Sequence, residues 1–175
     1  KDAPAVAALL PEISLELTYS EEQGQRIFLN GEDVSSEIRL PEMGMAASNV
    51  SAIPEVRAFL LEQQHGMAKR QSVIMDGRDI GTAVFPDAEL KIFVTASDEV
   101  RARRRYDELR AKGEEVAFEE ILANVRERDY IDSHRAVAPL RQAPDALVLD
   151  NSHMSIEEQD EWLWQAFQKA VNSIQ

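Results

Sequence analysis

The chain has 175 residues and a mass of 19.7 kDa, with 44% hydrophobic and 29% charged residues, which favours one domain with an ordinary hydrophobic core. Its 19 basic and 32 acidic side chains give a formal charge of -13, which excludes a general surface for nucleic acid or an anionic membrane. The chain has no cysteine, so disulfide bonds and thiolate metal sites are excluded. No apolar run approaches the length of a membrane span, and we expect a soluble, cytoplasmic monomer.

The first strand signals lie within residues 13–39. Apolar and polar residues alternate at its start, a turn containing Gly24 follows, and a second apolar stretch runs into Asn30-Gly31. Alternation followed by Asn-Gly predicts a β-hairpin. A third short strand is expected from two further apolar residues, Val34 and Ile38. The segment is therefore predicted to form a small antiparallel ribbon.

From Pro41 the pattern becomes helical, and Pro54 suits the first turn of a helix that runs toward Gln64. Three short apolar runs follow, at residues 72–75, 92–94 and 146–149. Such runs are typical of parallel strands that are buried on both faces. Further helices are predicted at residues 98–112, 118–134 and 156–174. Alternating strands and helices predict a wound α/β fold, with helices on both faces of a parallel sheet and the ribbon as an insertion.

Ligands of such a sheet bind beyond the carboxyl ends of its strands, so the residues after each run are informative. Residues 76–82, Asp-Gly-Arg-Asp-Ile-Gly-Thr, follow the first run. The two glycines permit a sharp turn, and Arg78 beside Asp79 offers a cation and an acceptor to one polar molecule. The alternative is a surface turn in which these two side chains are solvated or pair with each other. The pattern alone favours the surface turn.

A second cluster lies in the helix predicted around residues 118–135. Arg128, Asp132 and Arg135 are spaced four and three apart, so they share one helix face. This pattern is usually an exposed, salt-bridged face, and the preceding charged residues, Arg126, Glu127 and Asp129, make that interpretation credible. Two arginines that bracket an aspartate also suit a sugar phosphate, because guanidinium groups bind phosphate oxygens and a carboxylate accepts from ribose hydroxyls.

A third cluster opens the helix after residues 92–94, and it comprises Arg101, Arg103, Arg104 and Arg105. It is either a solvated helix face or a clamp on phosphates that are being transferred. The histidines are isolated in the sequence, so no metal site is predicted from His65, His134 or His153.

Four blocks of the sequence together resemble bacterial cytidylate kinases. They are residues 28–34, 46–50, 75–88, and a last block that runs from Glu127-Arg128-Asp129 through residues 135–140. The resemblance covers nearly the whole chain, in the right order. It implies a P-loop kinase fold and transfer of the γ-phosphoryl group of ATP, with Mg²⁺, onto CMP or dCMP to give CDP or dCDP.

The resemblance also implies roles for individual residues. Cytosine would be read by Ser48, Arg57 and Asp79, the CMP phosphate would be held by Arg78 and Arg135, and the sugar would be contacted by Arg128 and Asp132. The expected catalytic residues are Arg78, Arg128 and Arg135. Residues 13–65 would form the insertion that binds the nucleoside monophosphate, residues 106–118 would form a lid over ATP, and Arg104 or Arg105 would face the ATP phosphates.

One departure from that family is evident. The P-loop motif Gly-x-x-x-x-Gly-Lys-Ser/Thr cradles the phosphates of ATP, and this sequence has no Gly-Lys pair. We therefore expect the first strand, P-loop and helix, a unit of ~30 residues or more, to be absent from this chain. Three functions remain open: a kinase, a CMP-binding module without catalysis, and an acidic α/β interaction domain without a ligand.

Overall fold

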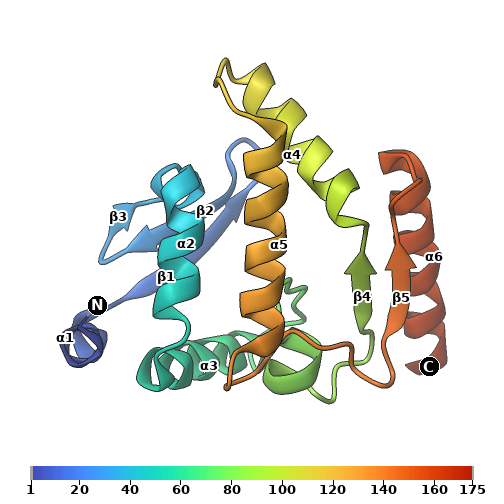
Figure 1. The fold of residues 1–175 in the computed structure, drawn as a ribbon. Coiled ribbons are helices and arrows are strands. Elements are labelled where there is room, and N and C mark those ends of the chain that lie inside the picture. The colour runs from blue at the N-terminus through green and yellow to red at the C-terminus, as the bar shows by residue number, and fades with distance from the viewer. Residues whose placement is uncertain (1, 175) are drawn as a thin grey trace. The chain divides into compact units, whose positions relative to one another are not determined.

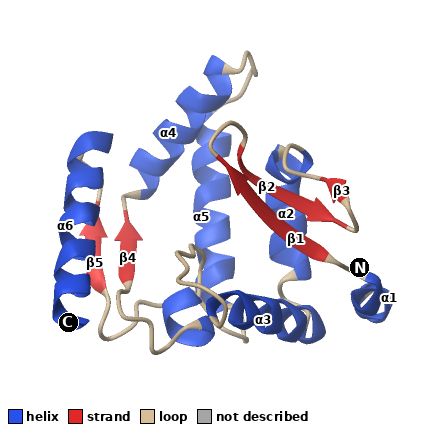
Figure 2. Ribbon diagram, turned by 180° about the vertical axis from the view of Figure 1, so that it is seen from behind, coloured by secondary structure: helices blue, strands red, loops and turns tan. Residues whose placement is uncertain are grey.

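The structure is a computed structural model that describes residues 2–174, apart from the side chains of residues 41, 42, 45 and 174. The chain divides into two compact units, Lys1–Val73 and Ile74–Gln175. Figure 1 shows the order of the elements along the chain, and Figure 2 shows that each unit has its own sheet. The predicted insertion, residues 13–65, lies within the first unit. Organisation as a single domain stays a prediction.

The first unit combines helices with a three-stranded antiparallel ribbon. Its elements are α1 (Ala3–Leu9), η1 (Leu10–Glu12), β1 (Leu15–Ser20), β2 (Gly24–Leu29), β3 (Glu32–Asp33), η2 (Glu37–Arg39), α2 (Pro41–Val50) and α3 (Pro54–Ala68). Pro54 occupies the first helical turn of α3, as predicted, because the missing N–H of proline is not needed there. Helix α1 contacts α3.

The predicted hairpin is confirmed. Strands β1 and β2 pair from Leu15↔Leu29 to Ser20↔Gly24. The turn between β2 and β3 is left-handed at both Asn30, with φ of 51°, and Gly31, with φ of 84°. These are the angles that Asn-Gly adopts most readily, so the local sequence selects this turn.

The third strand of the ribbon was placed too late in the sequence. It is Glu32–Asp33, whereas Ile38 lies in the 3₁₀ turn η2. The pairing of β2 with β3 ends because a side chain takes the place of a backbone acceptor. Ile27 N donates to Ser35 Oγ over 2.8 Å, and Ser35 is only 1% exposed. Asp33 in turn accepts from Ser35 Oγ at 2.5 Å, which holds the chain in a turn rather than in a longer strand.

The second unit contains a two-stranded parallel sheet. Its elements are η3 (Ile80–Val84), β4 (Ile92–Thr95), α4 (Asp98–Ala111), α5 (Phe118–His134), β5 (Leu147–Asp150) and α6 (Ile156–Ile174). The strands pair in register from Ile92↔Leu147 to Thr95↔Asp150, and α4 and α5 form the crossover between them. The three helices agree with their predicted ranges to within a residue. Helix α4 begins where Ser97 Oγ accepts from Val100 N over 3.2 Å.

The strand predicted at residues 72–75 does not form. A β-strand is stabilised by hydrogen bonds to a neighbouring strand, and no described residue pairs with this segment. Its Ile74 is accordingly 97% exposed. The prediction that β4 and β5 are buried on both faces is also wrong, since Val94 is 54% and Val148 is 49% exposed. The core of this unit is formed instead by small and aliphatic residues, among them Val84, Ala102, Leu109, Ala143, Leu149 and Ala166. Among residues 2–174, no helix is long and apolar enough to cross a membrane.

Candidate functional site

The segment of residues 76–79, called the 76–79 loop below, leads into a π-helical turn. The backbone oxygen of Asp79 accepts from Ala83 N over 2.8 Å, which fixes the direction of the chain directly after Arg78 and Asp79. Gly77 is required for packing, because a Cβ atom there would lie 2.9 Å from Cγ1 of Ile80. The loop therefore holds two adjacent charged side chains on a close-packed backbone.

Two ion pairs join the 76–79 loop to α5 and to the residue that follows it. Arg78 Nε donates to Asp132 Oδ2 over 2.8 Å, and Arg135 Nη2 donates to Asp79 Oδ1 over 3.0 Å. Asp79 is 8% and Asp132 is 6% exposed. Arg78 and Asp79 are thus neither solvated together nor paired with each other, as the surface-turn alternative required. Each reaches a partner of opposite charge, which buried carboxylates need.

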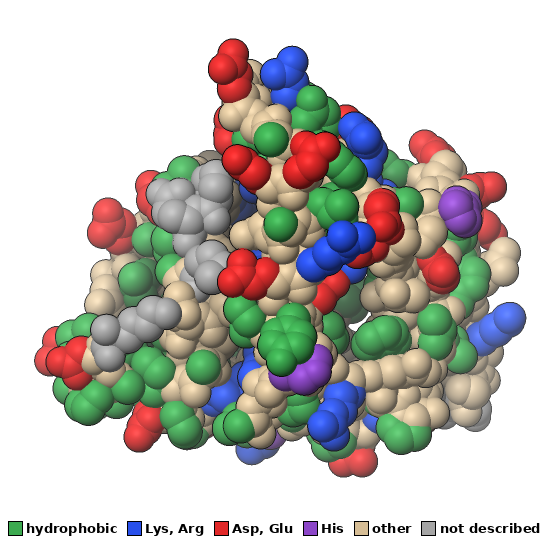
Figure 3. Space-filling view, in the orientation of Figure 1, with side chains coloured by type: hydrophobic (Ala, Val, Ile, Leu, Met, Phe, Trp, Pro, Cys, Tyr) green, Lys and Arg blue, Asp and Glu red, His purple; other side chains and the backbone are tan. Residues whose placement is uncertain are grey.

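A second set of ion pairs joins α5 to α4. Arg101 donates to both carboxylate oxygens of Asp129, with Nη1 to Oδ1 at 2.9 Å and Nη2 to Oδ2 at 2.6 Å. Arg126 bonds to Asp98 through Nε and to Glu99 through Nη2, the latter over 2.9 Å. Figure 3 shows basic side chains lying against acidic ones on the face over α4 and α5. We call Arg126 and Asp129 the α4-facing stripe, and Asp132 with Arg135 the loop-facing stripe.

Arg128 differs from its charged neighbours on α5. Its residue is half-buried, and its side chain forms no hydrogen bond or ion pair with any residue that the structure describes. Arg128 and Asp132 are four positions apart on α5, so the two side chains share a helix face. The predicted face of Arg128, Asp132 and Arg135 therefore combines one unpaired cation with two charges that are held by the 76–79 loop.

Two residues predicted to read the base lie together in the first unit. Ser48 is in the last turn of α2 and Arg57 is in the first turn of α3. Ser51 connects them, because its Oγ donates to Ser48 O over 3.0 Å and its backbone oxygen accepts from Arg57 Nη1 at 3.4 Å. Both residues are half-buried. The third predicted base reader, Asp79, belongs to the second unit.

Arg104 and Arg105 each have a partner in the structure. Arg104 donates to the side-chain and backbone oxygens of Asn151, which follows β5, at 3.0 and 2.7 Å. Arg105 donates to Glu108 over 2.7 Å, and Lys112 also donates to Glu108. Hydrogen bonds from Lys112 and Arg105 lower the pKa of Glu108. That either arginine faces ATP phosphates stays a prediction.

Lys91 was missed by the sequence analysis. Its side chain is only 7% exposed, and its Nζ donates to Asp145 over 2.7 Å and to the backbone oxygen of Pro86. The hydrogen bond from Lys91 lowers the pKa of Asp145. Its aliphatic stem lies behind the π-helical turn, where a Cβ on Gly81 would come within 3.3 Å of Lys91 Cδ. The available signal was a lone lysine directly before an apolar strand.

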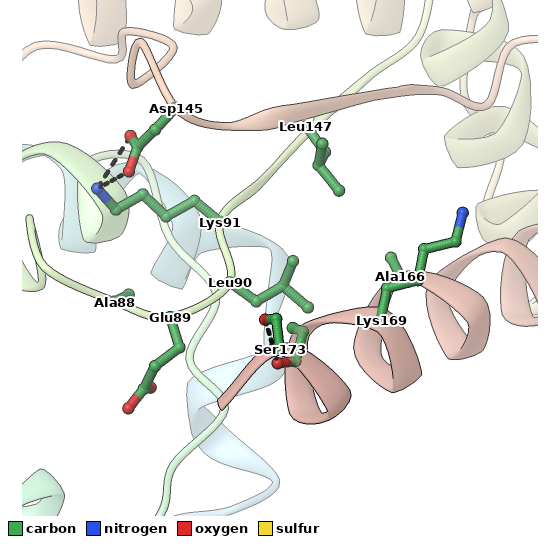
Figure 4. A pocket seen from close by; sticks show the side chains of 10 residues that line it. Ala88, Glu89, Leu90, Lys91, Asp145, Leu147, Ala166, Lys169 and Ser173 are labelled. Carbon is green, nitrogen blue, oxygen red and sulfur yellow. Dashed lines mark hydrogen bonds and ion pairs between the residues drawn. The ribbon is translucent and has the colours of Figure 1, made fainter. Parts of the chain in front are cut away.

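A pocket of about 370 Å³ lies at the amino ends of β4 and β5, beside α6. Figure 4 shows that Lys91 points toward Asp145 and that Lys169 points away from Leu90 and Ser173. Ligands of wound sheets bind at the opposite, carboxyl edge. We therefore do not assign the nucleotide site to this pocket.

Comparison with known proteins identifies the family. Residues 1–169 match the family described as Cytidylate kinase. The chain is 53% identical to the cytidylate kinase of Phocaeicola vulgatus over 98% of this chain and 75% of that relative. It is 51% identical to that of Bacteroides fragilis over 98% of this chain and 76% of the relative, and 58% identical to that of Bacteroides thetaiotaomicron over 82% and 63%.

These matches place the chain among the kinases, enzymes that transfer phosphoryl groups. It belongs to the cytidylate kinase family, which confirms the resemblance found in the sequence blocks. The α/β composition of the structure agrees with that family. The chain spans about three quarters of the length of the first two relatives named above.

Proposed function

We propose that this protein is a nucleoside monophosphate kinase that binds CMP or dCMP and converts it to CDP or dCDP with the γ-phosphoryl group of ATP. The observation that carries the proposal is the pair of crossed ion pairs between the 76–79 loop and the loop-facing stripe. They gather two guanidinium groups and two carboxylates in a chain whose family is named for CMP phosphorylation. Family membership supports the kinase over a binding module or an interaction domain.

Arg78 and Arg135 are proposed to hold the CMP phosphate. Arg78 gives only its Nε to Asp132, so its two terminal amino groups can donate to phosphate oxygens without breaking that ion pair. Its side chain is 50% exposed, which makes it accessible to a nucleotide. Arg135 is 14% exposed and is anchored through Nε to Ala138 O over 2.7 Å. One arginine is therefore accessible and the other is fixed in place.

Asp132 and Arg128 are proposed to contact the sugar. Asp132 accepts from Arg78 through Oδ2, and its other carboxylate oxygen can accept from a ribose hydroxyl. Arg128 supplies donors from the same helix face. Because these contacts position the sugar, they also orient the phosphate for attack on ATP, and positioning is a large part of phosphoryl-transfer catalysis.

Ser48, Arg57 and Asp79 are proposed to read the base. The 4-amino group of cytosine can donate to a carboxylate, whereas uracil presents an oxygen there that repels one. Arg57 can donate to the acceptor atoms of cytosine, and Ser48 can donate or accept. A site built to pair polar groups rejects a base that leaves those groups unpaired, so CMP should bind better than UMP.

The proposed use of ATP and Mg²⁺ rests on family membership alone. Among the described residues, no group of three or more His, Cys, Asp or Glu side chains lies together as a metal site. Arg104 and Arg105 bond to Asn151 and Glu108 in the structure, and the proposal that either one faces the ATP phosphates rests on the family. We therefore derive no step through ATP or Mg²⁺. We propose further that the fold is P-loop kinase-like, that residues 13–65 form the insertion for the nucleoside monophosphate, and that residues 106–118 form the lid.

The test is titration calorimetry of CMP and UMP into the parent and Asp79→Asn, with a coupled assay of ADP release from ATP. We expect CMP to bind more tightly than UMP, and Asp79→Asn to narrow the ratio, because its amide can donate to the uracil oxygen. Arg141→Met removes an exposed arginine of a nearby loop and is the matched control. A parent that binds neither nucleotide, or a ratio unchanged by Asp79→Asn, would contradict the proposal.

A further inference from the structure

The direction of the Arg128 side chain needs an explanation. An arginine side chain carries about 2 kcal/mol of rotamer entropy, and no described residue holds the Arg128 guanidinium. Its direction must therefore be set through its backbone, that is, through the rotation of α5 about its own axis. The contacts that fix this rotation lie on the residues next to Arg128.

Arg101 makes the most extensive of those contacts. Its guanidinium group donates to both oxygens of Asp129 and, through Nε, to Ala96 O over 3.1 Å. Ala96 follows β4, so one planar side chain ties together the end of a strand, the first turn of α4 and the middle of α5. The side chains of Arg101 and Asp129 are 37% and 44% exposed, so the pair is partly shielded from water. The hydrogen bonds that Arg101 donates to Asp129 raise the pKa of Arg101, which keeps the guanidinium group charged.

A second ion pair holds α5, on a face next to that of Asp129. An α-helix turns by about 100° per residue, so Asp129 and Asp132 project about 60° apart around the axis. Asp132 is held by Arg78 over 2.8 Å, while Asp129 is held by Arg101. A rotation of α5 would pull at least one of these carboxylates away from its partner. Arg128 precedes Asp129 by one residue, so the two contacts together determine where it points.

We propose that Arg101 is a positioning residue, which orients Arg128 toward the nucleotide by holding Asp129. This inference rests on the proposed function, because it assumes that Arg128 contacts CMP. Arg101 itself touches no nucleotide and acts through α5. Its planar fork matches the carboxylate of Asp129 at two points, which a lysine cannot reproduce.

Arg126 is the control residue, because its substitution distinguishes the positioning of Arg128 from a general loss of packing between α4 and α5. It also joins α5 to α4, by bonds to Asp98 and Glu99. Its side chain is 54% exposed, and neither bond involves Asp129. Arg126→Met therefore removes a similar number of helix-to-helix bonds and leaves the Arg101 contact intact.

The first measurement is a double-mutant cycle on the affinity for CMP, measured by calorimetry with the full chain. Because the effect of Arg101 on the nucleotide passes through Arg128, Arg101→Met should weaken CMP binding about tenfold. In an Arg128→Met background the same substitution should change the affinity less than about twofold. Arg101→Lys should retain part of the affinity, and Arg126→Met should leave it within about twofold of the parent. Additive losses, or an equal loss in Arg126→Met, would overturn the proposal.

The second measurement needs no nucleotide. The NMR order parameter of the Arg128 backbone N–H bond in the free protein should fall in Arg101→Met and stay unchanged in Arg126→Met. An unchanged order parameter in folded Arg101→Met would sink the proposal even if CMP affinity fell. If the parent fails to bind CMP, the proposed function is wrong, and this second measurement still decides whether Arg101 orients Arg128.

Discussion

The two charged stripes of α5 are alike in sequence and different in structure. Arg126 and Asp129 bond to the neighbouring helix, and their side chains are 54% and 44% exposed. Asp132 and Arg135 bond to the 76–79 loop, and their side chains are 9% and 14% exposed. Solvent screens the first set of ion pairs more than the second, so removing one partner should cost more stability in the loop-facing stripe. Burial, rather than charge spacing, therefore distinguishes a candidate ligand site from a helix-packing contact.

The largest expected effect tests this contrast directly. Arg135→Met leaves the carboxylate of Asp79, which is 8% exposed, without the partner that donates over 3.0 Å. We expect a loss of about 3 kcal/mol in the free energy of unfolding, measured by urea denaturation. Arg126→Met should cost about 0.5 kcal/mol, since exposed ion pairs contribute little. Equal losses in the two variants would show that burial does not separate the stripes.

A matched second variant makes the reason for that loss testable. In Asp79→Asn, Arg135→Met should cost less unfolding free energy than in the parent, because residue 79 no longer carries the buried charge that Arg135 faces. If Arg135→Met lowers the unfolding free energy equally in the parent and in Asp79→Asn, Arg135 would instead stabilise the fold through its bond to Ala138 O.

A smaller effect is expected from the backbone of the 76–79 loop. In Gly77→Ala the new methyl group would lie 2.9 Å from Ile80 Cγ1, so the Ile80 side chain, which begins the π-helical turn, must shift. We expect a loss of about 1 kcal/mol in unfolding free energy and weaker CMP binding, because Arg78 and Asp79 move with the turn. Gly66→Ala in α3 is the matched control, since nothing lies within 4 Å of its added Cβ, and it should stabilise by about 0.5 kcal/mol. A loss in the control as large as in Gly77→Ala would argue against a packing cause.

Local signals predicted most of the helices and the hairpin. Helical periodicity placed α4, α5 and α6 within a residue, and Asn30-Gly31 determined the hairpin, because these structures depend on neighbouring residues. Periodicity also placed Arg128 and Asp132 on one side of α5, whereas Arg135 follows the helix with an extended backbone, so its predicted place on the helix face was wrong. The strand at residues 72–75 failed, because strand formation depends on a partner that is remote in sequence.

The pairings within the site were not predictable from the sequence. Arg78 and Asp132 are 54 residues apart and Asp79 and Arg135 are 56 apart, so no local pattern connects them. The same holds for Arg101 and Asp129, which are separated by 28 residues. The sequence showed that charges alternate along α5, and only the tertiary structure shows which charges meet α4 and which meet the 76–79 loop.

The smallest expected effect is a pH dependence confined to the contacts between α4 and α5. Hydrogen bonds from Glu99 and Arg126 lower the pKa of Asp98 from 3.8 to about 2. Below about pH 4 the unfolded chain takes up a proton at this residue while the folded protein does not, so folding stability falls as the pH drops. The contribution of Asp98 is therefore complete above about pH 4 and is lost as the pH falls toward about 2.

Two variants isolate this contribution. The unfolding free energies of the parent and Asp98→Asn should converge as the pH is lowered from about 5 toward 2, because the protonated aspartate resembles the amide. Arg126→Met should show a shallower dependence than the parent, since one of the two causes of the lowered pKa is removed. Because the side chain of Asp98 is only half-buried and that of Arg126 is 54% exposed, added salt should shrink the difference between parent and variant, as expected for the α4-facing stripe. Parent and Asp98→Asn curves that stay parallel over this range would show that the ion pair with Arg126 does not stabilise the fold.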